Sequence, residues 1–198
     1  MPTRYSNFHL VELCGKVFFE VYMYYEKILM DSVSVDRTLS RLAHQIIECN
    51  DSINDVCLVG VIRKGVPLAN MLAEKIEQFS GVRPSIGKLD ISFHRDDTKV
   101  QQKQCLTDIP FDIVGKTVVL TDDVIYTGRT TRAAMDAIIN IGRPAKIQLA
   151  VLIDRGHREL PIRGDYVGKN IPTSQSERIK VKLPEFDGEV SVVLISDK

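Results

Sequence analysis

The sequence contains no tryptophan, and its four cysteines form no CxxC pair. The spacing of Cys14, Cys49, Cys57 and Cys105 suits neither a zinc site nor a disulfide framework, so we expect reduced thiols in a cytoplasmic protein. Neither sign of charge prevails, because Lys plus Arg and Asp plus Glu number 26 each. This balance excludes proteins that coat nucleic acid through bulk positive charge, although it allows a local basic patch.

Long apolar runs are missing as well. The stretch Val17–Met30 is apolar and aromatic, but Glu20, Glu26 and Lys27 interrupt it, so it cannot span a bilayer. No secretory signal is visible, and we expect a soluble protein with no membrane partner. With 198 residues, of which 44% are hydrophobic, the chain can bury a sizeable core.

Strand, turn and helix alternate along the middle of the chain, which predicts an α/β fold with a parallel sheet. The expected strands are Val56–Ile62, Ile86–Phe93, Thr117–Thr121 and Lys146–Ile153, and the expected helices are Val66–Phe79 and Thr130–Ile141. Shorter strands are expected at 166–167, 179–183 and 190–195. A polar stretch from His94 to Asp108 shows no apolar periodicity, and loops of this length tend to be functional or mobile.

The chain before the first expected strand has two parts. The first thirty residues carry seven of the thirteen aromatic side chains and indicate a helix with no clean polar face. Residues 36–50 predict a second helix, with Leu39, Leu42 and Ile46 at helical spacing and Ser34 or Asp36 as its cap.

The segment Val118–Thr130 carries the chemistry. An apolar strand delivers two adjacent carboxylates, Asp122 and Asp123, to its carboxyl end, where ligands bind in open α/β sheets. A hydroxyl-rich turn with Gly128 then opens a helix, and its backbone N–H groups with the hydroxyls of Thr127 and Thr130 make a phosphate cradle. A P-loop and a dinucleotide-binding fingerprint are excluded, since the full patterns GxxxxGK[ST] and GxGxxG are absent. The alternative, an ordinary turn followed by a capped helix, explains the paired acids poorly.

This segment resembles the phosphoribosyl pyrophosphate (PRPP) signature of type I phosphoribosyltransferases, with Arg129 where many members have a second glycine. Residues 89–97, 108–113, 154–163 and 167–174 are similar to a bacterial family of pyrimidine operon regulators that are also uracil phosphoribosyltransferases. The resemblance runs from about Asp36 to Ile195. It implies a type I phosphoribosyltransferase fold, a parallel-rich twisted sheet flanked by helices with a small hood.

The resemblance also implies a function and a domain organisation. Uracil and PRPP give UMP and pyrophosphate, with Mg²⁺ bound mainly through PRPP and no dedicated metal site, and UMP or UTP promotes binding to pyrimidine-operon leader RNA for transcription attenuation. Residues 31–198 form the transferase domain, with hood elements mainly within 154–183. Residues 1–30 are an atypical N-terminal extension. The family forms homodimers or larger homo-oligomers.

Site residues follow by their match to the family. Asp122 and Asp123 bind the ribose hydroxyls. By the same match, the 5-phosphate is bound by Thr127, Gly128, Arg129 and Thr130, and the pyrophosphate by Arg63, Lys64 and Gly65. Arg95 and Asp96 belong to a loop that closes over the reacting centre. From the residues alone, the cations of the 63–65 turn could be solvated loop charges and the loop could be disordered.

The match assigns RNA binding to Ser40, Arg41, His44, Arg155, Arg158, Arg163 and Lys169. From the residues alone these would be a solvated surface, because runs of charge usually are. Two other functions stay open. One is an RNA-binding regulator whose catalysis has decayed, which Lys64 in place of a more usual arginine and the short loop favour. The other is a transferase without an RNA role.

Overall fold

The computed structural model describes residues 3–13, 16–94 and 105–197, so the predicted loop residues Arg95 and Asp96 lie outside the described residues. The chain divides into two compact units. Residues Asp36–Pro172 form the larger one, and the two chain ends, Met1–Val35 and Thr173–Lys198, form the other. None of the helices in the described part of the chain is long and apolar enough to span a membrane.

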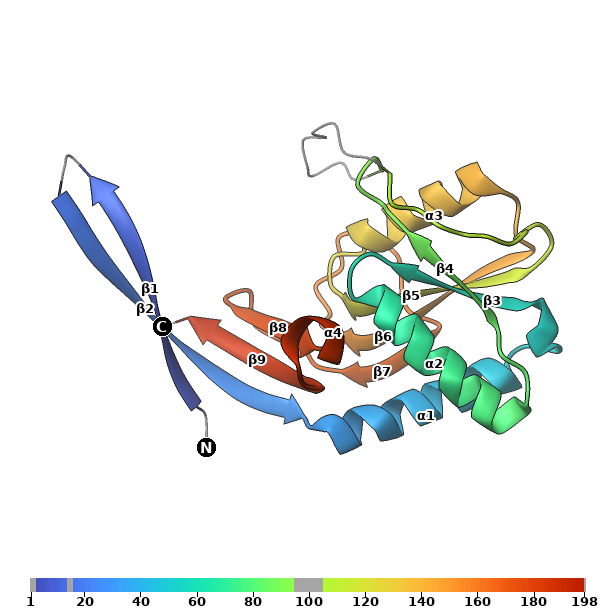
Figure 1. Cartoon of the computed structure of the whole chain (residues 1–198), viewed down its shortest axis with the longest axis horizontal. Helices are drawn as coiled ribbons and strands as arrows, with labels where there is room; N and C mark the ends of the chain where they lie inside the picture. Colours follow the sequence, from blue (N-terminus) through green and yellow to red (C-terminus); the bar gives the residue numbers. More distant parts are fainter. Residues whose placement is uncertain (1–2, 14–15, 95–104, 198) are drawn as a thin grey trace. The chain divides into compact units, whose positions relative to one another are not determined.

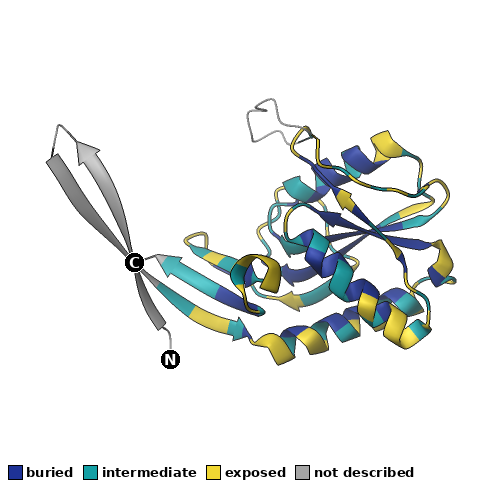
Figure 2. Cartoon of the chain, in the orientation of Figure 1, coloured by how far each residue is buried: buried dark blue, intermediate teal, exposed yellow. Residues whose placement is uncertain are grey.

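Five parallel strands form the sheet of the larger unit, in the order β4-β3-β5-β6-β7 (Figure 1). Their bounds are β3 (Val56–Val61), β4 (Ser85–Leu89), β5 (Thr117–Ile125), β6 (Lys146–Asp154) and β7 (Tyr166–Asn170). All six residues of β3 are buried, as is typical of a strand covered on both faces (Figure 2). The sheet confirms the predicted α/β fold class.

Helices cover the two faces of this sheet. They are α1 (Ser32–Glu48), α2 (Gly65–Ser80) and α3 (Arg129–Ile141), and a short 3-10 turn, η1 (Ile53–Asp55), precedes β3. Ala134 of α3 belongs to a core cluster with Val59 and Leu120, whereas Leu39 of α1 and Leu68 of α2 meet the other face. The cap predicted for α1 is wrong. The carboxylate of Asp31 accepts a hydrogen bond from the backbone N–H of Ser34 at 2.8 Å, so Asp31 caps the helix.

The smaller unit is a four-stranded antiparallel sheet in the order β1-β2-β9-β8. It consists of β1 (Thr3–Leu13), β2 (Lys16–Met30), β8 (Glu177–Lys182) and β9 (Ser191–Asp197), with the short helix α4 (Pro184–Asp187) between the last two. The helix predicted for the first thirty residues is therefore wrong. Valine, phenylalanine and tyrosine favour strands, and β9, which is distant in the sequence, pairs with β2 from Tyr24 to Met30.

A polar network joins the end of β4 to residues 106–108. Backbone hydrogen bonds of 2.8 and 2.9 Å join Lys88 and Asp108. The buried carboxylate of Asp90 accepts hydrogen bonds from the N–H groups of Ser92 (2.9 Å) and Leu106 (3.2 Å). The strand predicted to reach Phe93 ends at Leu89, because the Asp90 side chain then takes the place of a ladder partner for the backbone.

Candidate active site

The predicted acid pair lies within the last part of β5. Pairing with β3 stops at Thr121, opposite Gly60, whereas pairing with β6 continues through Asp122 and Val124 to Ile125. The predicted end of the strand at Thr121 is therefore four residues too early. Asp122 and Asp123 therefore lie in the part of β5 that runs beside β6 and no longer beside β3.

Two close backbone contacts hold the turn after β3 beside the acid pair. A Cβ on Gly65 would stand 2.1 Å from the carbonyl oxygen of Thr121, and a Cβ on Gly60 would stand 2.5 Å from the Cα of Val66. Only glycine fits such contacts, so α2 begins directly against β5. The peptide bond between Ile62 and Arg63 is cis. The structure thus brings the predicted pyrophosphate turn next to the acid pair.

Asp123 has a pKa that the fold shifts upward. Burial raises its pKa above the ordinary value of 3.8, and the positive charge of Lys64 opposes that rise. The backbone N–H of Asp123 also donates to the Asp122 carboxylate at 2.9 Å. A buried acid whose charge depends on a neighbouring cation is typical of a functional site.

The predicted phosphate loop borders a pocket of about 390 Å³. Gly128 precedes α3 with φ of 93°, a left-handed conformation that favours glycine, and the hydroxyl of Thr127 accepts a hydrogen bond from the Arg129 N–H at 3.4 Å. The first N–H groups of a helix lack partners within it, so the start of α3 offers donors to an anion. The pocket is lined by residues 124–131 and by Glu159, whose carboxylate lies 2.7 Å from Nε of Arg129.

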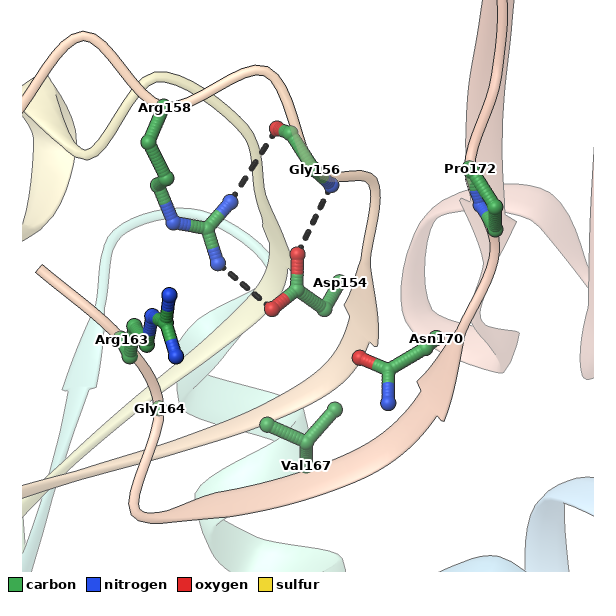
Figure 3. Close-up of a pocket in the computed structure, with 8 residues that line it drawn as sticks. All are labelled: Asp154, Gly156, Arg158, Arg163, Gly164, Val167, Asn170 and Pro172. Carbon is green, nitrogen blue, oxygen red and sulfur yellow. Dashed lines mark hydrogen bonds and ion pairs between the residues drawn. The ribbon is translucent and has the colours of Figure 1, made fainter.

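The segment that follows β6 is held by Arg158 (Figure 3). Its guanidinium donates to the Asp154 carboxylate at 2.6 Å and to the carbonyl oxygens of Tyr126 and Ile162 at 2.8 Å each, and also to that of Gly156 at 3.2 Å. Arg158 and Arg163 are among the residues that line a second pocket, of about 450 Å³. Arg158 therefore uses its donors inside the protein, and its predicted role in RNA binding stays a prediction.

An aromatic and cationic cluster adjoins the phosphate loop. The guanidinium of buried Arg155 lies 4.2 Å from the centre of the Tyr126 ring, and the His157 ring meets Tyr126 edge-on at 5.8 Å. Tyr126 belongs to the signature, yet no role was predicted for it. Glu159 was missed as well, because nothing in the local pattern shows that it pairs with Arg129, thirty residues earlier.

The residues predicted to bind RNA separate into two groups. Arg41 of α1 donates to the carbonyl oxygens of Val167 and Gly168 in β7, beside the exposed Lys169. His44 stacks on Phe79 of α2, with ring centres 4.1 Å apart. The structure thus brings Arg41 next to the strand that carries Lys169, whereas Arg155 and Arg158 lie inside the segment after β6.

A parallel sheet flanked by helices, with an acid pair beside the predicted phosphate loop, is typical of a type I phosphoribosyltransferase, and the comparisons show that fold. Residues 32–185 match the family model of the phosphoribosyl transferase domain. Among solved structures, a hypoxanthine-guanine phosphoribosyltransferase of Bacillus anthracis is similar with a TM-score of 0.67 and 20% identity, over 85% of this chain and 96% of that one. At this identity the likeness shows the fold alone.

The sequence relatives are closer. The chain is 56% identical to a bifunctional protein PyrR of Chloroflexus aurantiacus over 86% of its own length and 95% of the relative's. It is also 56% identical to a bifunctional protein PyrR of Thermoanaerobacter sp., over 86% and 97% of the two chains. The chain belongs to the PyrR family of phosphoribosyltransferases. This confirms the predicted enzyme class and the predicted function, a uracil phosphoribosyltransferase that also regulates pyrimidine genes.

Proposed function

We propose that the carboxyl edge of the five-stranded sheet binds PRPP in one extended pose. Asp122 and Asp123 accept hydrogen bonds from the ribose hydroxyls. The two ends of PRPP are held by the turn Arg63, Lys64 and Gly65 and by the loop Thr127, Gly128, Arg129 and Thr130. The observation that supports this pose best is the contact of Gly65 with the Thr121 backbone, which fixes the turn beside the acid pair.

The reaction needs positioning and charge more than covalent help from the protein. The bond between ribose C1 and pyrophosphate breaks, a bond from C1 to a uracil nitrogen forms, and that nitrogen loses its proton. Positive charge develops on the sugar and negative charge on the leaving group. Arg63 and Lys64 hold the leaving pyrophosphate, and the nearby carboxylates favour the cationic sugar.

We also propose Mg²⁺ as the cofactor. Carboxylate oxygens suit this hard cation, and Asp122 and Asp123 supply them at the ribose end of the site. Among the described residues no group of three or more His, Cys, Asp or Glu side chains could hold a metal ion. Mg²⁺ would therefore take most of its ligands from PRPP and water, and when bound it neutralises charge on the pyrophosphate.

For the regulatory activity we propose that leader RNA binds along α1 and β7 when UMP or UTP fills the active site. Ser40 and Arg41 lie about one turn before His44 on α1. Arg41 donates a hydrogen bond to β7 next to Lys169. Arg163 extends this set toward the second pocket. Placed donors of this kind can recognise splayed bases of an RNA loop without a large basic surface. The proposed assembly is a homodimer or a larger homo-oligomer.

The enzymatic proposal is tested with radiolabelled uracil, PRPP and Mg²⁺, with hypoxanthine and orotate assayed in parallel. UMP formation from uracil alone is expected. The double variant Asp123→Ala, Thr127→Ala should lose this activity while keeping the circular dichroism spectrum of the wild type, and Glu74→Ala on the exposed surface of α2 should keep activity. Unchanged turnover in the double variant would contradict the site. No product with any base would favour a regulator without catalysis.

The RNA proposal is tested by gel shift with a pyrimidine-operon leader hairpin, with and without UMP. Arg41→Ala and Lys169→Ala should weaken the UMP-dependent complex about tenfold each, as expected for the loss of a charged contact to RNA. Arg143→Ala is the matched control, because Arg143 is an exposed cation just before the amino end of β6. A complex that none of these variants weakens would place the RNA elsewhere, and no complex at all would favour a transferase without an RNA role.

A further inference from the structure

The phosphate pocket contains an acid that a phosphate-binding site would not be expected to need. Among the residues that line it, Glu159 places its carboxylate 2.7 Å from the Nε of Arg129. Arg129 is the cation of the loop and stands at the first position of α3. A phosphate bound at the start of α3 would therefore meet a guanidinium that already has a carboxylate partner.

Glu159 is presented to the pocket from a fixed backbone. The N–H groups of Glu159 and Leu160 both donate to the carbonyl oxygen of Thr127, at 3.0 and 3.2 Å. The preceding residue, Arg158, donates a hydrogen bond to the carbonyl oxygen of Tyr126 at 2.8 Å. Removing the carboxylate from Arg129 therefore requires rotation of the Glu159 side chain and no movement of the segment.

The ion pair itself is easily exchanged. The side chains of Arg129 and Glu159 are 42% and 51% exposed, and pairs at such exposure contribute little to stability because water screens them. A phosphate carries more charge than a carboxylate, and like a carboxylate it can accept two parallel hydrogen bonds from a guanidinium. Phosphate is thus the stronger partner for Arg129, whereas Glu159 is the partner that the chain itself supplies.

We propose that Glu159 is a positioning residue that competes with the ligand's 5-phosphate for Arg129. This inference rests on the proposed function, since it takes the pocket as the 5-phosphate site. The competition lowers the affinity for every ligand that carries the phosphate, PRPP and UMP alike, and leaves a ligand without it unaffected. Because tight binding of the product slows its release, a weakened phosphate contact favours turnover.

The test compares UMP with uridine on the Glu159→Gln variant by isothermal titration calorimetry. Glutamine keeps the shape and removes the charge, so UMP and inorganic phosphate should bind about fivefold more tightly, whereas uridine should bind as it does to the wild type. The KM for PRPP should fall by a similar factor, with a smaller change in kcat. Glu159→Asp, which keeps the charge, should stay near the wild type. Glu74→Gln is the matched surface control.

The results separate this inference from the proposed function. In an Arg129→Ala background the Glu159→Gln gain should shrink, because the competition acts through Arg129. Unchanged or weaker binding of UMP to a folded Glu159→Gln variant would overturn the inference, as would an equal gain for uridine, and both would leave the proposed function standing. A folded wild-type protein that binds neither UMP nor PRPP would overturn both.

Discussion

Gly65 stands against the backbone of Thr121, so close that a Cβ on Gly65 would lie 2.1 Å from the Thr121 carbonyl oxygen. The neighbouring Asp122 Cα would be 3.4 Å away. This contact joins the first residue of α2 to the strand that carries the acid pair. The relative position of the proposed pyrophosphate turn and the acid pair is therefore set by backbone atoms, which can shift less than side chains can.

The first prediction concerns this contact. Gly65→Ala forces α2 away from β5, and we expect it to lower the free energy of unfolding by about 2–3 kcal/mol, the usual cost of an overpacked core. The displaced turn should also bind pyrophosphate poorly, so the KM for PRPP should rise at least tenfold. Urea denaturation and steady-state kinetics measure the two effects.

Gly115→Ala is the control for a glycine substitution as such. Gly115 has φ of 71° and open space where a Cβ would stand, so alanine there meets strain alone, about 1 kcal/mol. The KM for PRPP should then be that of the wild type. If Gly65→Ala binds PRPP as well as Gly115→Ala does, the close contact does not position the turn.

The second prediction concerns Asp123, whose pKa is raised by burial. Between the ordinary value of 3.8 and the raised value the folded state holds more protons than the unfolded state, so this group makes stability fall as pH rises. Asp123→Asn removes the buried charge. Its free energy of unfolding should therefore exceed that of the wild type at neutral pH, and the difference should shrink as pH falls toward 4.

Urea denaturation from pH 4 to pH 8 measures this difference, and Asp55→Asn, on an exposed residue of η1, is the control. The same Asp123→Asn variant should lose most of its transferase activity, because an amide accepts fewer hydrogen bonds from ribose than a carboxylate. A stabilised and inactive variant indicates a functional acid. A variant less stable than the wild type at every pH would mean that the Asp123 charge is needed for folding.

The strands and helices around the site could be predicted because their signals are local. The apolar run that begins at Val56 predicts a buried strand, and the glycine before α3 predicts the start of a helix. Where the prediction was wrong, pairing with another strand decided. Residues 3–13 and 16–30 form strands because β1 and β2 pair with each other and β9 pairs with the end of β2, and β5 runs beyond Thr121 because β6 continues to pair with it.

The same distinction applies to the site. The acid pair and the phosphate loop follow from residue types in one segment. The contact of Glu159 with Arg129 and the anchoring of Arg158 on Tyr126 join segments about thirty residues apart. Side-chain partners of that kind are chosen by the folded geometry, and the sequence contains no spacing that would reveal them.

The third prediction concerns Arg158. Lysine keeps its charge but cannot reach Asp154, Tyr126 and Ile162 together, so Arg158→Lys leaves partly buried acceptors without donors. We expect a loss of about 2–3 kcal/mol in the free energy of unfolding. Arg163→Lys, on the exposed side of the same pocket, should change it by less than about 0.5 kcal/mol. Equal effects would mean that the Arg158 hydrogen bonds add nothing to stability.

The last prediction concerns Cys57, which is buried in β3. Burial raises the pKa of its thiol from 9.0 to about 11, a rise that the charge of Lys116 partly opposes. The thiolate is the reactive form, so a thiol reagent at pH 8 should not modify Cys57 in the folded protein. Cys57→Ala should leave the number of fast-reacting thiols unchanged and lower the number in denaturant by one, whereas Cys49→Ala, which removes an exposed thiol, should lower both.

Because the folded thiol keeps its proton to a higher pH than the unfolded one, the free energy of unfolding of the wild type relative to Cys57→Ala should fall as pH rises from about 9 toward 11. A fast-reacting Cys57 would show that the amino end of β3 opens in the folded protein.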